Sequence, residues 1–392
     1  MLAIMTIDGH VAAGFEAVRE AFAANFAEQG DVGAAVAVYR DGRPVVDLWG
    51  GLADPRTGRP WQRDTLQLVY SVTKGVLATL AHLLAQRGEL DLDAPVARYW
   101  PEFAAAGKGE IPVRWLLTHQ AGLAAIDTPV PLADALTWQP MVDALAAQTP
   151  NWTPGTAHGY HGRTFGWLVG EVLRRVTGRT VGELLALEIA EPLAADFHIG
   201  LPESERSRVS RLVFGPEVDF TAIPDAQIPD GLRDLVAALR DPNSLSNRAF
   251  AVTDPDKVDF NDPAVQAAEI PSSNGIGTAR GLARIYAALI GEVDGVRLFT
   301  PETRTAATAE QVSGTDLVIQ LPGRVATGYM LPTETIPFGG PSAFGHPGRG
   351  GSLAFADPET GIAFAYVTNY ILEGAPDLRA RNLCTAVWDS LG

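Results

Sequence analysis

A serine and a lysine three residues apart are the residues of this sequence best suited to do chemistry. Ser71 and Lys74 stand at the start of an apolar stretch with helical periodicity, residues 75–87. Positions i and i+3 share one face of a helix, so the serine hydroxyl and the lysine amine can converge on one point. Burial lowers the pKa of a lysine, and a neutral amine can take the proton of the serine. The spacing therefore predicts a nucleophile beside its general base.

Composition supports this interpretation of Ser71 and Lys74. The chain has 30 basic residues but only three lysines, at positions 74, 108 and 257, so a chance Ser-x-x-Lys match is rare. The first turn of a helix also has unpaired backbone N–H groups and the positive end of the helix dipole, which stabilise an oxyanion. The alternative is that Ser71 caps the helix while Lys74 lies in solvent.

Length and charge limit the class of protein. A chain of 392 residues exceeds what one hydrophobic core normally supports, so two lobes are expected. A net charge of −16 argues against nucleic acid or an anionic membrane as a partner. The single cysteine, Cys384, excludes an internal disulfide. Residues 1–10 lack the features of a signal peptide and no apolar run reaches the roughly 18 residues of a membrane span, so a cytoplasmic location is expected.

The elements that must position Ser71 fall into three blocks. Periodicity predicts helices over residues 11–28, 164–176, 181–189, 230–239, 279–290 and 380–391. It predicts strands over residues 33–39, 44–49, 316–320, 326–330, 352–356 and 362–370, with Asp41-Gly42 as a hairpin turn between the first two. The order sheet, helical insert, sheet predicts a discontinuous α/β domain of residues 1–70 and 271–392 and a mainly helical domain of residues 71–270. The polar segment 203–262 is a candidate lid over a site.

Three further segments accompany the Ser-x-x-Lys pattern. They are Leu-Leu-Thr-His-Gln-Ala-Gly-Leu at 116–123, Pro-Gly-Thr at 154–156 ahead of Tyr160, and residues 273–284. With them, nearly the whole chain resembles the serine β-lactamase and penicillin-binding protein superfamily, most closely the class C β-lactamases and family VIII carboxylesterases. The resemblance implies an α/β fold with an antiparallel sheet flanked by helices and an all-helical insert domain.

The second motif of that superfamily, Tyr-x-Asn, corresponds to Tyr160-His161-Gly162. The resemblance implies that Tyr160 relays the serine proton and protonates the leaving group, a role that suits the phenol if a cation such as Lys74 lowers its pKa. In the lactamases the asparagine helps to hold the substrate amide, so Gly162 weakens the lactamase interpretation. His161 is expected to line the substrate pocket. The alternative is that Tyr160 only packs a loop onto the helix.

The third motif, Lys-Thr-Gly, falls at His346-Pro347-Gly348. The lysine that binds a penicillin carboxylate is absent, as is common among the esterases, so ester cleavage is favoured. The resemblance implies that His346 and Gly348 help to bind substrate, and that the backbone N–H groups of Ser71 and Arg349 form the oxyanion hole. Losing one such donor typically costs about 2.7 to 4 kcal/mol. The alternative is that residues 345–351 are a glycine-rich turn without chemistry.

Other kinds of site fit the sequence less well. Residues 350–354 lack the last glycine of a nucleophile elbow, and residues 345–352 lack the lysine of a P-loop. Residues 275–281 have dinucleotide-loop glycines at the wrong spacing and without a preceding strand. His158 and His161 have no cysteine or carboxylate at a zinc-like spacing, so we expect neither a metal nor a cofactor.

The predicted function is that of a serine carboxylesterase for small, short-acyl esters, acting through an acyl-enzyme with Ser71, Lys74 and Tyr160. Transfer of the acyl group to an alcohol or amine remains open, because the same residues would perform it. The alternatives are a β-lactamase, another amide hydrolase or a D-alanyl peptidase, and a non-catalytic member of the fold. The expected partner is a small-molecule ester; the natural ester and the oligomeric state are not predicted.

Overall fold

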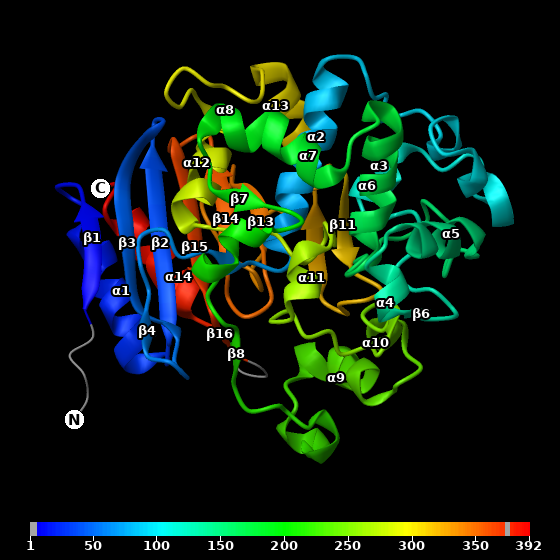
Figure 1. Ribbon diagram of the computed structural model, residues 1–392. Coiled ribbons are helices and arrows are strands. Elements are labelled where there is room, and N and C mark those ends of the chain that lie inside the picture. The colour runs from blue at the N-terminus through cyan, green and yellow to red at the C-terminus, as the bar shows by residue number, and fades with distance from the viewer. Residues whose placement is uncertain (1–5, 373–376) are drawn as a thin grey trace.

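The computed structural model describes residues 6–372 and 377–392 (Figure 1). Residues 1–5, which belong to the stretch used above to predict that no signal peptide is present, lie outside the described residues. An antiparallel sheet has the strand order β1-β3-β2-β15-β14-β13, with β4 as a seventh strand beside β3. These strands are β1 Ile7–Val11, β2 Gly33–Arg40, β3 Arg43–Asp54, β4 Arg59–Pro60, β13 Phe344–Pro347, β14 Leu353–Asp357 and β15 Ile362–Thr368.

The middle of the sheet is apolar on both faces because helices cover it on both sides. Every residue of β14 and β15 is buried. Helices α1 (Glu16–Glu28) and α14 (Arg379–Asp389) pack together on one face, in a core that includes Phe22, Phe364 and Leu383. Helix α12 (Ala279–Ile290) packs on the other face, against β2, β14 and β15. The antiparallel sheet flanked by helices is confirmed.

Helices dominate residues 72–267, drawn toward the right in Figure 1. The α-helices of this part are α2 Val72–Gln86, α3 Val113–Leu117, α4 Leu132–Ala135, α5 Gln139–Ala147, α6 Thr164–Thr177, α7 Val181–Leu185, α8 Glu191–Leu193, α9 Arg233–Arg240, α10 Leu245–Arg248 and α11 Pro263–Ala267. Helix α13, Pro301–Thr308, comes later in the chain. Helix α2 is buried on all sides from Val72 to Leu84 and packs against α6. The division into two domains at residues 71 and 270, and the lid over 203–262, stay predictions.

The described residues also form four small sheets, three of which join distant parts of the chain. The strands are β5 Gln67–Leu68, β10 Ile276–Gly277 and β7 Phe197–His198 in one sheet, then the pairs β11 Val312–Thr315 with β12 Pro322–Val325, β16 Tyr370–Ile371 with β8 Val213–Phe214, and β6 Val130–Pro131 with β9 Thr253–Asp254. The pairing of β5 with β10 places the residues before Ser71 beside those after Ser273.

Two predicted strands are wrong. Residues 316–320 form a turn, because the Asp316 carboxylate accepts hydrogen bonds from the backbone N–H groups of Val318 and Ile319, both at 2.8 Å. Residues 326–329 also turn, with the Ala326 N–H donating to the Tyr329 carbonyl at 2.8 Å. The strand character lies just before each segment, in β11 and β12.

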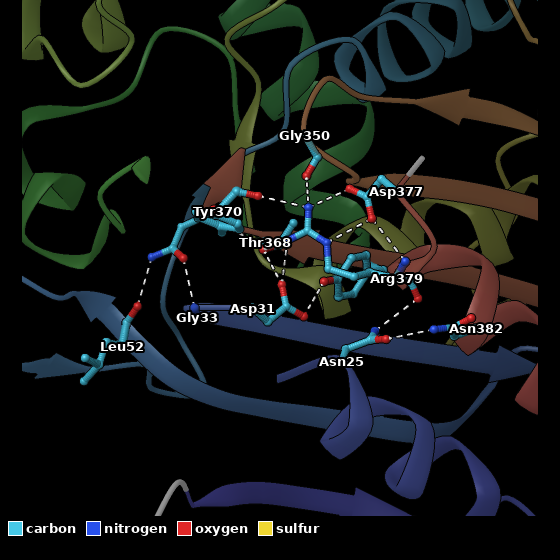
Figure 2. Close-up of polar contacts among 12 residues, drawn as sticks. Asn25, Asp31, Gly33, Leu52, Gly350, Thr368, Tyr370, Asp377, Arg379 and Asn382 are labelled. Atoms are coloured by element: carbon cyan, nitrogen blue, oxygen red, sulfur yellow. Dashed lines mark hydrogen bonds and ion pairs between the residues drawn. The ribbon is translucent and has the colours of Figure 1, made fainter. Parts of the chain in front are cut away.

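A buried arginine fastens the last helix to the sheet and to the loop after β13 (Figure 2). Arg379 has no exposed surface and donates to Asp31 at 2.8 Å and to Asp377 at 2.6 Å. The same guanidinium donates to the Gly350 carbonyl at 3.0 Å. Arg379 therefore ties the loop of residues 348–351 to the rigid sheet.

No helix among the described residues is both long enough and apolar enough to cross a lipid bilayer.

Candidate active site

Ser71 lies where a short strand turns sharply into the buried helix α2. Tyr70, just before it, has a φ of 47°, a strained conformation for a residue with a side chain, and forms a bridge with Asn274. Ser71 occupies the N-cap position, but its side chain makes no capping hydrogen bond. The alternative in which this serine merely caps the helix is therefore not what the structure shows.

Lys74 is fully buried, and its amine faces the Ser71 hydroxyl. Nζ lies 3.1 Å from Ser71 Oγ, and it donates to the carbonyl oxygens of Gly162 at 2.8 Å and Ser272 at 2.9 Å. Burial, together with the charge of Arg163, holds the pKa of Lys74 well below its ordinary value. A neutral amine has two N–H groups and one lone pair. If the two N–H groups donate to the two carbonyls, the lone pair faces the serine hydroxyl. The predicted direction of the lysine pKa is confirmed.

Tyr160 completes the cluster from the other side. Lys74 Nζ lies 4.8 Å from the centre of the Tyr160 ring. Burial raises the pKa of Tyr160, a hydrogen bond with Ser71 opposes the rise, and the Asp316 carboxylate adds to it. The expectation that a cation lowers the pKa of Tyr160 is wrong, because desolvation outweighs its neighbours. Tyr160 is therefore a neutral phenol that can donate a proton or pass one on.

The loop carrying Tyr160 is held by two histidines. The His161 ring donates from Nδ1 to the Gly159 carbonyl at 2.7 Å, and its Nε2 accepts from the Leu123 N–H at 3.0 Å. Burial lowers the pKa of His161 to about 4, so the ring is neutral. The backbone N–H of His161 donates to Nδ1 of His119, whose ring lies 5.0 Å from that of Tyr160. Both ring nitrogens of His161 thus bind backbone, and its expected contact with substrate stays a prediction without support from this geometry.

His119 has a positioning role that the sequence analysis did not assign. It was noted only as part of the 116–123 segment, yet its ring and its carbonyl both hold the Tyr160 loop: the carbonyl accepts from the Gly159 N–H at 3.1 Å. The available signal for this role was the position of His119 inside the 116–123 segment, which accompanies the catalytic motifs.

Strand β13 and the loop after it bring His346, Gly348 and Arg349 to the opposite wall. The His346 ring is buried, lies 6.0 Å from that of Tyr160 and donates from Nδ1 to the Pro347 carbonyl. Burial, with the nearby Lys74, lowers the pKa of His346 to about 3. A side chain at Gly348 would begin 2.3 Å from the Val69 carbonyl, so only glycine lets this loop approach the strand before Ser71. The substrate contacts of His346 and Gly348 and the oxyanion role of Arg349 stay predictions.

Phe250 is a second residue near the site that sequence reasoning missed. A Cβ atom at Gly162 would lie 2.5 Å from the Phe250 ring, so this ring fills the space that a side chain at position 162 would need. The ring is 43% exposed and lies 6.4 Å from that of Tyr160. Nothing in the local sequence connects two positions so far apart.

A cavity of about 970 Å³ opens beside this cluster. Its wall includes Tyr70, Arg163, Phe250 and Arg349, with residues of the 203–262 segment around the outside. Tyr70, which lines the cavity, directly precedes Ser71 in the chain, and the ring of Phe250, which also lines it, lies 6.4 Å from that of Tyr160. The nucleophile, the base and the phenol therefore lie near a cavity large enough for a small organic molecule.

The structure combines a buried Ser-x-x-Lys pair, a neighbouring tyrosine and an antiparallel sheet flanked by helices. These are the features that the resemblance to the serine β-lactamase superfamily implies. The Beta-lactamase family model matches residues 18–383, and the chain belongs to that family. It is 39% identical to the esterase/beta-lactamase LipL of Mycobacterium tuberculosis over 368 residues, which cover 91% of this chain and 82% of LipL.

Comparison with solved structures supports the same family assignment. A penicillin-binding protein homologue from Caulobacter crescentus superposes with a TM-score of 0.86 at 40% identity, covering 98% of this chain and all of that one. A family VIII carboxylesterase superposes with a TM-score of 0.85 at 37% identity, with the same coverage. The chain is therefore a serine hydrolase of the esterase/β-lactamase type with the class C β-lactamase-like fold.

Proposed function

We propose that this protein is a carboxylesterase that cleaves small, short-acyl esters through an acyl-enzyme on Ser71. The observation that carries the proposal is the amine of Lys74, buried, 3.1 Å from Ser71 Oγ, and bound otherwise to carbonyl oxygens. Such an amine is a base at neutral pH, which an exposed lysine is not. A cytoplasmic location stays a prediction from the sequence.

The reaction begins as Lys74 Nζ takes the proton of Ser71 and Oγ attacks the ester carbonyl. The carbonyl oxygen becomes an oxyanion, held by the backbone N–H groups of Ser71 and Arg349. When the C–O bond to the alcohol breaks, Tyr160 gives the alcohol its proton and recovers one from the protonated Lys74. Water then attacks the acyl-enzyme with the same groups in reverse, releasing the acid and restoring Ser71. An alcohol or amine in place of water gives acyl transfer.

The Phe250 ring supports an ester over a lactam substrate. The lactamase asparagine would stand at position 162, where Phe250 leaves no room for a side chain. The resemblance gives that asparagine a substrate amide as its partner, and a simple ester has no amide group, so the apolar ring costs ester binding nothing.

The test is hydrolysis of 4-nitrophenyl butyrate by the wild type and by Ser71→Ala. We expect the variant to lose at least about 1,000-fold in kcat/KM, as for loss of a covalent nucleophile. A fluorophosphonate probe should label Ser71 in the wild type alone. Retention of most activity by Ser71→Ala overturns the assignment.

β-Lactam hydrolysis is a second candidate, because LipL is named as both an esterase and a β-lactamase. Nitrocefin turnover comparable to that of 4-nitrophenyl butyrate, lost in Ser71→Ala, would favour this candidate over the ester.

A further inference from the structure

Arg163 is a positive charge in the cavity wall that has no acidic partner among residues 6–372 and 377–392. The residue is half-buried, and its Cζ lies 5.0 Å from the centre of the Phe260 ring. Among the described residues, no carboxylate lies within 4.0 Å of the guanidinium, and no hydrogen bond from it is found. Burial, opposed by Tyr70 and helped by the charge of Arg349, lowers the pKa of Arg163 to about 10, so the group remains a cation at neutral pH. A guanidinium has five N–H donors, which a half-buried site cannot leave wholly to water.

A second guanidinium stands at the same wall. Arg349 Cζ lies 5.9 Å from the centre of the Tyr70 ring, and that ring packs edge-on against Phe260 at 5.1 Å. Arg163 and Arg349 thus flank the two aromatic rings next to Ser71, and both line the cavity of about 970 Å³. The two like charges interact and raise the positive potential of this part of the cavity wall.

The other cations of this cavity are paired. Arg240 binds Asp225 at 2.7 Å, and Lys257 binds Glu217 at 2.8 Å. These outer charges therefore largely cancel, in a chain whose net charge is −16. Arg163 differs from them because no carboxylate in the described part of the chain pairs with it, although acids are abundant in this protein.

We propose that Arg163, supported by the positive potential of Arg349, binds a carboxylate of the substrate, so that the preferred substrates are acidic esters. These are half-esters of dicarboxylic acids, with the carboxylate on the acyl side, or esters of an alcohol that bears a carboxylate. A planar guanidinium matches a carboxylate with two parallel hydrogen bonds. This inference rests on the proposed esterase activity and names its substrate class.

The test compares matched esters with and without a carboxylate. For the acyl side the pair is mono-4-nitrophenyl adipate and 4-nitrophenyl hexanoate; for the alcohol side it is 4-acetoxybenzoate and 4-acetoxybenzamide. We expect kcat/KM of the wild type to favour the acid in one pair, and Arg163→Gln to reduce that preference by about 10-fold or more, the size of a lost charged hydrogen bond. Any effect of Arg163→Gln on Lys74 changes kcat/KM of both esters of a pair alike, so the ratio of the two values is independent of that effect.

Two control variants sharpen this comparison. Arg163→Lys keeps the charge and should retain part of the preference, while Arg240→Gln, at a paired position of the same cavity, should retain all of it. Equal loss in Arg163→Gln and Arg240→Gln would contradict a specific site at Arg163.

Calorimetric binding of adipate and of 4-hydroxybenzoate to Ser71→Ala separates the two proposals. Hydrolysis of the neutral esters through Ser71 without preference for either acid would overturn the carboxylate site and leave the esterase intact. Arg163-dependent binding of either anion to a protein that cleaves no ester would support the site and overturn the esterase.

Discussion

Two cationic side chains, Lys74 and Arg379, are both completely buried, yet they differ in what surrounds the charge. Lys74 contacts two carbonyl oxygens and a serine hydroxyl, and its pKa is lowered by burial and by Arg163. Arg379 contacts the carboxylates of Asp31 and Asp377. Burial alone would lower the pKa of Arg379, but the hydrogen bond to Asp377 and the neighbouring acids raise it instead.

The comparison shows that the partners of a buried cation decide whether it becomes reactive or structural. Without a carboxylate, burial lowers the pKa of the amine, which favours the neutral form that can act as a base. With two carboxylates, the guanidinium stays charged and cross-links α14, the sheet and the loop of residue 350 (Figure 2). On the proposed mechanism, one fold uses the burial of a basic side chain for catalysis at Lys74 and for attachment of a helix at Arg379.

A third buried side chain, Lys108, shows that burial among carbonyl oxygens does not by itself make an amine catalytic. Its amine donates to the carbonyls of Ala105, Ala146 and Gln148, and burial lowers its pKa too. Its hydrogen-bond partners among the described residues include no hydroxyl. Lys74 differs because Ser71 takes the place of one carbonyl.

The largest expected effect comes from Lys74→Met with Lys108→Met as its matched control. Each change removes a buried amine and leaves carbonyls without a donor, so each should lower the free energy of unfolding by about 1–3 kcal/mol per unsatisfied group. Only Lys74→Met should also lower kcat/KM for 4-nitrophenyl butyrate, by about 100-fold to 10,000-fold. Equal activity in the two folded variants would contradict the role given to Lys74.

The next largest effect is expected on the free energy of unfolding when Arg379 is replaced. Arg379→Met leaves the Asp31 carboxylate buried without its cation, and we expect the free energy of unfolding to fall by about 3–5 kcal/mol in urea denaturation. Arg379→Met combined with Asp31→Asn should recover part of that loss, because the uncompensated charge is gone. If the double variant is less stable than the single variant, the ion pair is not what makes the arginine structural.

The pH dependence of activity follows from the lowered pKa of Lys74. Only the neutral amine can take the serine proton, so kcat/KM should rise with pH through a pKa well below the ordinary lysine value and then level off. Arg163→Gln removes a positive charge that lowers this pKa, so the rising limb should move to higher pH. A limb that moves to lower pH, or stays in place, would show that Arg163 does not act on Lys74.

A smaller effect is expected at the Gly162 carbonyl, one of the partners that keep Lys74 in place. Gly162→Asn forces a side chain into the Phe250 ring, which should displace the carbonyl and cost about 1–3 kcal/mol of stability together with activity. Adding Phe250→Ala should restore part of both, measured by denaturation and by ester hydrolysis. Additive losses would mean that the two residues do not share this space.

The sequence predicted those parts of the fold and the site that depend on residues close together in the chain. Ser71 and Lys74 lie one helical turn apart, so their spacing alone predicted their meeting, and the apolar runs of β14 and β15 predicted buried strands. The superfamily motifs then indicated Tyr160 and the loop after β13.

The rest depends on contacts between distant residues. Asp31 and Arg379 are 348 positions apart, and the Gly162 carbonyl that binds Lys74 is 88 positions from it. The rise in the pKa of Tyr160 depends on how completely the fold excludes water, which no motif reveals. The turn at residues 316–320 was missed because the Asp316 side chain takes the backbone N–H groups that a strand would have used.

The most direct test of the account is the protonation state of Lys74 in the folded protein. The chain has three lysines, so NMR spectra of protein with ¹³C- and ¹⁵N-labelled lysine contain three side-chain signals, and Lys74→Met identifies the relevant one. We predict that the Lys74 amine has the chemical shifts of a neutral amine at pH 7. Shifts of an ammonium group that persist to about pH 10, close to the reference value for lysine, would contradict the central claim.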